Sequence, residues 1–171
     1  MNGVITRPAT RLEPDRGLLR ADQFQMAYAT NDIDRACALF RERLGIREFT
    51  RLEGAMPEGG HIRVELAWAG STMYELIMAS GPGSELFMDR LPEGGEFTIR
   101  HHHLGFLLPD EASWDALMGE IERGGWRMTG FNHNVGFMRR CFVAVPHLDH
   151  YLEYILPEPA GAAFLEAVAA S

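Results

Sequence analysis

Four polar side chains in this sequence form two pairs with the same spacing, and together they could bind a metal ion. Gln25 and His103 lie 78 positions apart (103 − 25 = 78), and Glu75 and Glu153 are separated by the same interval (153 − 75 = 78). An imidazole, two carboxylates and an amide oxygen form a mixed set of nitrogen and oxygen ligands. Such a set suits a divalent ion such as Zn, Ni, Co, Mn or Mg, with open positions for water or a substrate oxygen.

The predicted secondary structure around these residues repeats as well. A strand at about 24–30 leads into a helix capped by Asn31 or Asp32, and a strand at about 101–108 leads into a helix that starts at Asp110. Asp32 and Asp110 are again 78 positions apart (110 − 32 = 78). Three further strands are predicted in each half: about 46–52, 61–68 and 73–78, then about 126–131, 137–145 and 151–156. The sequence therefore predicts a duplicated β-α-β-β-β module.

One domain with a short segment on each side accounts for the whole length. The modules are expected at about 23–80 and 100–157, which gives a domain over residues 23–157. Residues 80–99, which are rich in Gly and Pro, are predicted to connect the modules. Residues 1–22 are interpreted as an N-terminal extension that could be ordered against a partner subunit. Residues 158–171 are predicted to hold a short helix, at about 161–169.

Strand alternation indicates which way the candidate ligands point. Gln25 lies on the opposite face of its strand from Met26 and Tyr28, which are expected to pack on the helix layer. By the same rule Glu75, His103 and Glu153 also point away from the helices, toward a concave surface that both modules share. Alternation further predicts that His101 shares this face with His103 and that His102 does not. Arg139 and Arg140 are adjacent, so only one of them can face inward.

Composition and charge exclude several other classes of function. A net charge of −8 argues against nucleic-acid binding, which needs clustered Lys and Arg. No apolar run approaches the roughly 18 residues of a membrane span, and the first residues do not form a signal peptide. Two cysteines, Cys37 and Cys141, provide no disulfide framework, so a cytoplasmic location is expected. The expected partner is a small molecule, with neither nucleic acid nor membrane involved.

The motifs taken together resemble the vicinal oxygen chelate superfamily, which includes glyoxalase I, methylmalonyl-CoA epimerase, resistance proteins and extradiol dioxygenases. The stretch from Gln25 to Ala36 is similar to that family's opening strand and helix start, and His103-Leu-Gly-Phe is similar to its central strand. Tyr74-Glu75-Leu76 and Leu152-Glu153-Tyr154 resemble the strands that end each module. The resemblance implies an α+β fold in which two βαβββ modules form a curved cup, usually within a homodimer.

The ligand identities imply a reaction type within this family. The set Gln25, Glu75, His103 and Glu153 resembles the glyoxalase I pattern of the eukaryotic type. It implies a divalent-metal-dependent lyase or isomerase that removes a proton next to the carbonyl of a small substrate through a metal-bound enediolate. Glu153 is the favoured catalytic base by this resemblance, and Glu75 is the other candidate. Nothing in the sequence identifies a glutathione site.

Three alternative functions stay open. An acyl-thioester epimerase is the nearest enzymatic alternative. A metal-free protein could use the same cup to bind a small ligand, as resistance proteins of the superfamily do. A ring-cleaving dioxygenase is disfavoured because Gln25 stands where those enzymes resemble one another in having His.

Further polar residues are candidates for contact with a substrate. His61, Arg63 and Glu65 alternate with apolar residues and line one face of their strand, while His101 is expected to lie beside His103. Arg63 could hold a carboxylate or a phosphate. A face that is simply solvated is the alternative interpretation of the strand at 61–68.

Overall fold

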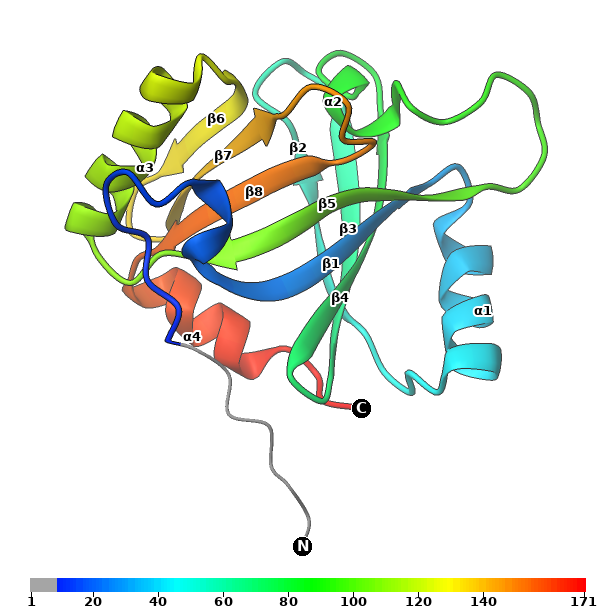
Figure 1. Cartoon of the computed structure of the whole chain (residues 1–171). Helices are drawn as coiled ribbons and strands as arrows, with labels where there is room; N and C mark the ends of the chain where they lie inside the picture. The colour runs from blue at the N-terminus through cyan, green and yellow to red at the C-terminus, as the bar shows by residue number, and fades with distance from the viewer. Residues whose placement is uncertain (1–8) are drawn as a thin grey trace, which may run out of the picture.

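The computed structural model describes residues 9–171 and shows one curved sheet in two halves (Figure 1). The strands lie in the order β2-β3-β4-β1-β5-β8-β7-β6. The first module contains β1 (Asp22–Thr30), α1 (Ile33–Leu44), β2 (Thr50–Ala55), β3 (His61–Ala69) and β4 (Thr72–Ser80). The second contains β5 (Ile99–Leu107), α3 (Glu111–Gly124), β6 (Arg127–Asn134), β7 (Met138–Ala144) and β8 (Tyr151–Pro157). The predicted α+β fold of two βαβββ modules is confirmed.

The two modules meet along their first strands. β1 and β5 pair antiparallel in the middle of the sheet, β4 runs parallel to β1, and β8 runs parallel to β5. The first turns of α1 and α3 are capped in the same way. Asp32 accepts a hydrogen bond from the amide of Arg35 at 3.0 Å, and Asp110 accepts one from Ser113 at 2.8 Å. The repeated spacing in the sequence therefore corresponds to repeated structure.

Two helices cover the convex face of the sheet. α1 packs on β1, β3 and β4 through a buried cluster that includes Phe40, Ala67 and Leu76. α3 packs on β5, β7 and β8 through another that includes Trp114 and Tyr154. Figure 1 shows these two helices on either side of the molecule. The face away from them is the concave face, toward which the candidate ligands were predicted to point.

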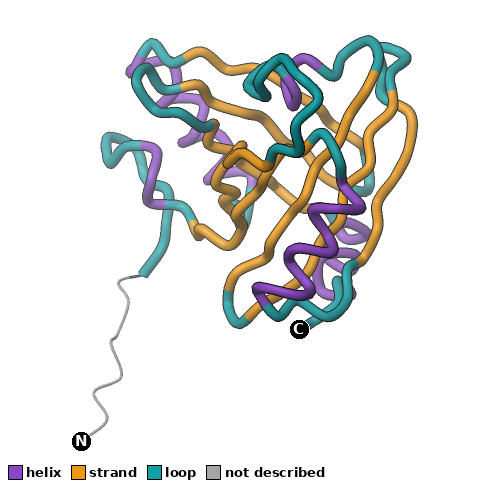
Figure 2. Tube along the Cα trace, turned by 90° about the vertical axis from the view of Figure 1, so that its right-hand side faces the viewer, coloured by secondary structure: helices purple, strands orange, loops and turns teal. Residues whose placement is uncertain are grey.

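The concave face is not an open cup, because two shorter helices pack into it. These helices are α2 (Glu85–Met88), which was not predicted within the connection, and α4 (Pro159–Ala167). Phe87 of α2 and Leu165 of α4 belong to the same buried cluster as Met73 and Phe142. The indole of Trp68 donates a hydrogen bond to the carbonyl of Leu165 at 3.1 Å. Figure 2 shows α4, near the C-terminus, lying across the strands.

The N-terminal segment from residue 9 onward packs on the second module of its own chain. Leu12 and Leu18 are buried against the α3 side of the sheet. Tyr154 donates a hydrogen bond to the carbonyl of Leu18 at 2.7 Å, and the amide of Gly17 donates one to Glu120 at 3.1 Å. These residues therefore pack on their own chain, whereas the part of the predicted extension over residues 1–8 lies outside the described residues, and its predicted order against a partner subunit stays a prediction.

Boundary differences are small and have local causes. β2 begins at Thr50 rather than near residue 46, because Ile46 is buried and its amide closes the end of α1 on Phe40 at 3.2 Å. α4 begins two residues earlier than expected, with Pro159 in its first turn, where a missing amide proton costs nothing. None of the helices in the described residues is long and apolar enough to cross a membrane.

Candidate metal centre

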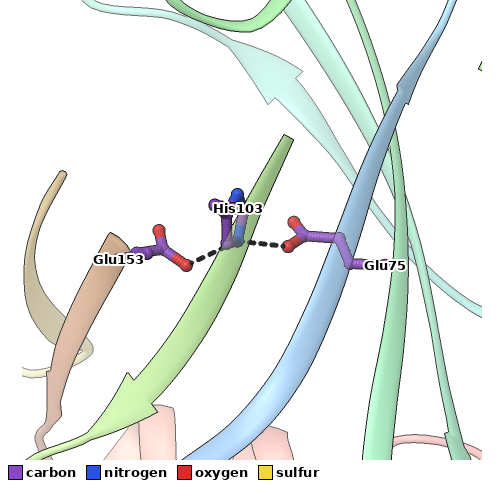
Figure 3. A group of neighbouring side chains, drawn as sticks. All are labelled: Glu75, His103 and Glu153. Atoms are coloured by element: carbon purple, nitrogen blue, oxygen red, sulfur yellow. Dashed lines mark ion pairs between the residues drawn. The ribbon is translucent and has the colours of Figure 1, made fainter. Parts of the chain in front are cut away.

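Three oxygen atoms converge on one nitrogen of His103. Its Nε2 lies 3.0 Å from Glu153 Oε2, 3.2 Å from Glu75 Oε2 and 3.3 Å from Gln25 Oε1. Figure 3 shows the two carboxylates approaching the imidazole from opposite sides. One ring nitrogen carries at most one proton, so it cannot donate to all three oxygens. Lone pairs that converge in this way are what a shared cation requires.

The register of the central strands explains how residues so far apart in sequence meet. Ala27 of β1 pairs with both Glu75 of β4 and His103 of β5. Gly105 of β5 pairs with both Gln25 of β1 and Glu153 of β8. The four strands that carry the predicted ligands are therefore consecutive in the sheet. The ligand atoms of Glu75, His103 and Glu153 all lie within 4.8 Å of one another.

The cluster of candidate ligands is almost completely buried, so its polar and charged side chains need partners inside the protein. His103 is 1 % exposed, and the side chains of Glu153 and Glu75 are 5 % and 12 % exposed. Glu75 Oε2 is buried, and the part of the chain that the structure describes gives it no well-aligned hydrogen bond. A buried carboxylate oxygen without such a partner is costly. Two carboxylates, one amide and one imidazole therefore fit a divalent metal ion, for which Gln25 would supply the fourth ligand.

Comparison with protein families gives one match. Residues 22–143 match the model of the glyoxalase/bleomycin resistance protein/dioxygenase superfamily. The chain belongs to this superfamily. No curated protein sequence matches the chain.

Solved structures with a similar fold include two epimerases. Methylmalonyl-CoA epimerase from Mycobacterium tuberculosis is 17% identical with a TM-score of 0.55, and the match covers 88% of this chain and 97% of that chain. A Streptomyces coelicolor methylmalonyl-CoA epimerase variant in complex with 2-nitronate-propionyl-CoA is 18% identical with a TM-score of 0.54, and the match covers 80% and 97%. At such low identity the likeness shows a shared glyoxalase-like fold.

The histidine predicted to lie beside His103 is not the one found there. β5 contains a bulge opposite β1, where Ala27 pairs with His103 but Tyr28 pairs with His101. His102 is the extra residue, and it lies on the concave side with its Nδ1 2.8 Å from His103 Nδ1. His101 instead contacts Tyr28 and His150, with ring centroids 5.8 Å and 4.7 Å away. The prediction for these two histidines was therefore wrong: His102, and not His101, shares the concave face with His103.

The structure does not bring the three candidates on β3 to the cluster. Arg63 lies on the convex side, where it forms ion pairs with Asp34 of α1 at 2.8 Å and with Glu65 at 2.7 Å. Glu65 also forms an ion pair with Arg51 at 2.8 Å. His61 lies 3.4 Å from the carboxylate of Glu53, near the end of the strand. In this glyoxalase-like fold Arg63 and Glu65 belong to a network that fastens α1 to the sheet.

Arg140 is the inward member of the arginine pair, and sequence reasoning did not assign it a role. Its Nη1 donates to Glu153 Oε1 at 3.2 Å, while Arg139 reaches outward to Glu111 of α3 at 2.8 Å. Its guanidinium carbon lies 5.3 Å from the centre of the Phe142 ring. Arg140 thus holds one oxygen of Glu153 and leaves the other oxygen directed at His103.

The charges of the cluster depend on one another. Burial alone would lower the pKa of His103, but Glu153 and Glu75 outweigh it and raise that pKa to about 9. For Glu153, burial opposes ionisation, but His103 and Arg140 bring its pKa below the usual range. Burial, followed by the charge of His103, lowers the pKa of His102 to about 3, so this ring stays neutral. Without a metal, the site therefore holds one imidazolium between carboxylates.

Gly105 provides the space that the Gln25 side chain occupies. A Cβ atom at position 105 would lie 2.7 Å from Gln25 Cβ and closer still to its Oε1. We expect Gly105→Ala to displace Gln25 and to lower the free energy of unfolding by about 1–3 kcal/mol. Urea denaturation and metal titration of the variant measure the two effects. Unchanged stability and metal affinity would show that Gln25 can move without consequence.

Gly119→Ala is the matched control for this prediction. Gly119 lies inside α3, and a Cβ there would approach only Arg123 Nη1, at 3.9 Å. We expect this substitution to stabilise the protein by about 0.5–1 kcal/mol, because Ala is the better helix former. Metal affinity should not change.

Proposed function

We propose that this protein is a divalent-metal-dependent lyase or isomerase that moves a proton at the carbon next to the carbonyl of a small substrate. Gln25, Glu75, His103 and Glu153 would hold the metal. The observation that carries the proposal is the convergence of three oxygens on His103 Nε2, all within 3.3 Å. When bound, a divalent ion would polarise the substrate carbonyl and stabilise the charge left by the departing proton.

The surroundings of the two carboxylates favour different roles for them. Arg140 binds Glu153, and the charge of its guanidinium stabilises the ionised carboxylate, which weakens Glu153 as a proton acceptor. Within residues 9–171 no arginine pairs with Glu75, and its side chain is the more exposed of the two. We therefore assign proton removal and return to Glu75, and retention of the metal to Glu153. This reverses the preference that the family resemblance implied.

An acyl-thioester epimerase is the second candidate. The epimerases with a similar fold act in the same chemical class, since epimerisation also removes and returns a proton. Glu75 and Glu153 approach His103 from opposite sides, as an exchange between two faces of one carbon would need (Figure 3). Glu65, which was predicted to contact a substrate, is held on the convex face by Arg51 and Arg63, away from these two carboxylates.

Two measurements on freshly purified protein test the proposal. Elemental analysis should find close to one divalent metal ion per chain. Proton NMR in D₂O, with a panel of small α-hydroxycarbonyl compounds and acyl thioesters, should show deuterium entering next to the carbonyl. Chelation should stop this exchange and added metal should restore it. A protein that never binds metal would be a binding protein instead, and oxygen uptake with catechols and iron would indicate a dioxygenase.

Metal binding should release a proton from His103. The raised pKa of about 9 means that His103 is an imidazolium near neutral pH in the metal-free protein, and ligation needs its free Nε2 lone pair. We therefore expect release of about one proton per metal bound, and an affinity that rises roughly tenfold per pH unit until pH reaches the raised pKa. Calorimetry in two buffers of different ionisation enthalpy measures the proton count.

The control for this titration is His61→Ala. His61 is half-exposed and pairs with Glu53 away from the cluster, so its removal should leave the proton count unchanged. Metal binding without proton release in the wild type would contradict the assigned charge state of His103.

The predicted homodimer and small-molecule partner stay predictions, and sedimentation velocity tests the first of them.

A further inference from the structure

His102 is a buried histidine whose two ring nitrogens both have partners. Its Nδ1 lies 2.8 Å from Nδ1 of His103, and its Nε2 lies 2.9 Å from the backbone carbonyl oxygen of Leu86. Each of the two imidazoles is 1 % exposed. The proposed function uses His103 but assigns nothing to His102.

The partners of His102 determine where the protons lie. A carbonyl oxygen only accepts, so the proton of a neutral His102 is on Nε2 and is donated to Leu86. Nδ1 of His102 is then an acceptor, and the proton between the two rings belongs to Nδ1 of His103. With its proton on Nδ1, a neutral His103 has a free lone pair on Nε2. That lone pair points at the oxygens of Gln25, Glu75 and Glu153.

We propose that His102 is a positioning residue that holds His103 in the tautomer and ring orientation needed to bind metal, with the Leu86 carbonyl as its anchor. This inference rests on the proposed metal-dependent function. Metal-binding histidines usually donate their second N–H to a carboxylate, a carbonyl or water. In this protein an imidazole takes that place and relays the hydrogen bond to the backbone of α2.

The fold holds His102 tightly in this position. The bulge in β5 turns two consecutive histidines to the concave side, which regular alternation would forbid. The His102 ring stacks on Phe87, with centroids 5.5 Å apart, and also packs against Phe142 and Tyr151 at 5.7 Å and 5.3 Å. These aromatic neighbours leave the ring little freedom to turn. Through Leu86, the segment that connects the modules is tied to the metal centre.

Two variants separate the hydrogen bond from the packing. His102→Phe retains an aromatic ring but leaves the Nδ1 proton of His103 without an acceptor. His102→Asn can offer an oxygen close to the position of the original Nδ1. We expect Zn²⁺ to bind roughly 10–100-fold more weakly to His102→Phe than to the wild type, and His102→Asn to recover much of that loss. Thermal unfolding of each metal-free variant reports any purely structural damage.

The tautomers can also be read directly in the wild-type protein. Long-range ¹H–¹⁵N correlation on the Zn²⁺-loaded protein should show His103 protonated at Nδ1 and His102 protonated at Nε2 only. A proton on Nδ1 of His102 would overturn the inference, and this measurement needs no variant to fold. Equal Zn²⁺ affinity in His102→Phe and wild type would overturn it while leaving the proposed function intact. A wild type that binds no divalent metal ion would overturn both.

Discussion

Replacing His103 with alanine is expected to lower metal affinity by more than about 100-fold, because it removes the nitrogen ligand on which all the other ligands converge. The same change should destabilise the metal-free protein. Glu153 and Glu75 lie 3.0 Å and 3.2 Å from the imidazole, and both would lose their buried cationic neighbour. Removing one partner of a buried ion pair costs about 3–5 kcal/mol. We expect a value near the lower limit, since Arg140 still compensates Glu153.

Equilibrium dialysis measures the loss of metal binding, and urea denaturation in the presence of a chelator measures the loss of stability. His61→Ala is the matched control, since that histidine also pairs with a glutamate but is half-exposed. An exposed pair of this kind contributes about 0–1 kcal/mol, and the metal affinity of this variant should equal that of the wild type. If His103→Ala keeps a full equivalent of metal, the ion binds elsewhere and the candidate centre is wrong.

The repeat in the sequence predicted the duplicated module, strand alternation turned the four candidate ligands to one face, and the family resemblance implied that two modules form one cup. Strand and helix patterns are local, and duplication places equivalent residues on equivalent strands. In the sheet β1 and β5 pair in the middle, and the strands that carry Glu75 and Glu153 are their outer neighbours. The offset of 78 residues between Gln25 and His103 therefore corresponds to equivalent positions on two strands that lie side by side.

The errors came from features that alternation does not describe. A bulge depends on how a strand meets its neighbour, so nothing in His101-His102-His103 by itself shows which ring turns inward. Alternation also left open what the face of β3 that carries Arg63 would contact, for a different reason. The concave side of that strand is apolar because α4 packs on it, and the position of α4 depends on tertiary contacts such as the one between Trp68 and Leu165.

Glu75→Gln is expected to reduce kcat by about 10²–10⁴-fold at saturating metal, the usual contribution of a general acid–base group. The amide keeps an oxygen that can still face the ion, so a full equivalent of metal should remain bound at high metal concentration. Glu153→Gln should act mainly on the metal instead. It removes the negative charge that Arg140 orients, and the single amide oxygen must serve either that guanidinium, now at 3.2 Å, or the ion. Its metal affinity should fall while kcat at saturating metal falls less.

Comparing the two variants tests which carboxylate carries the proton, because the two are expected to respond differently to added metal. Activity lost in Glu153→Gln should return as metal is raised, whereas activity lost in Glu75→Gln should not. Glu65→Gln is the control, since this buried carboxylate belongs to the Arg51 and Arg63 network on the convex face. It should lower stability and leave kcat unchanged. The opposite pattern, with Glu153→Gln inactive at every metal concentration and Glu75→Gln active, would return the catalytic role to Glu153.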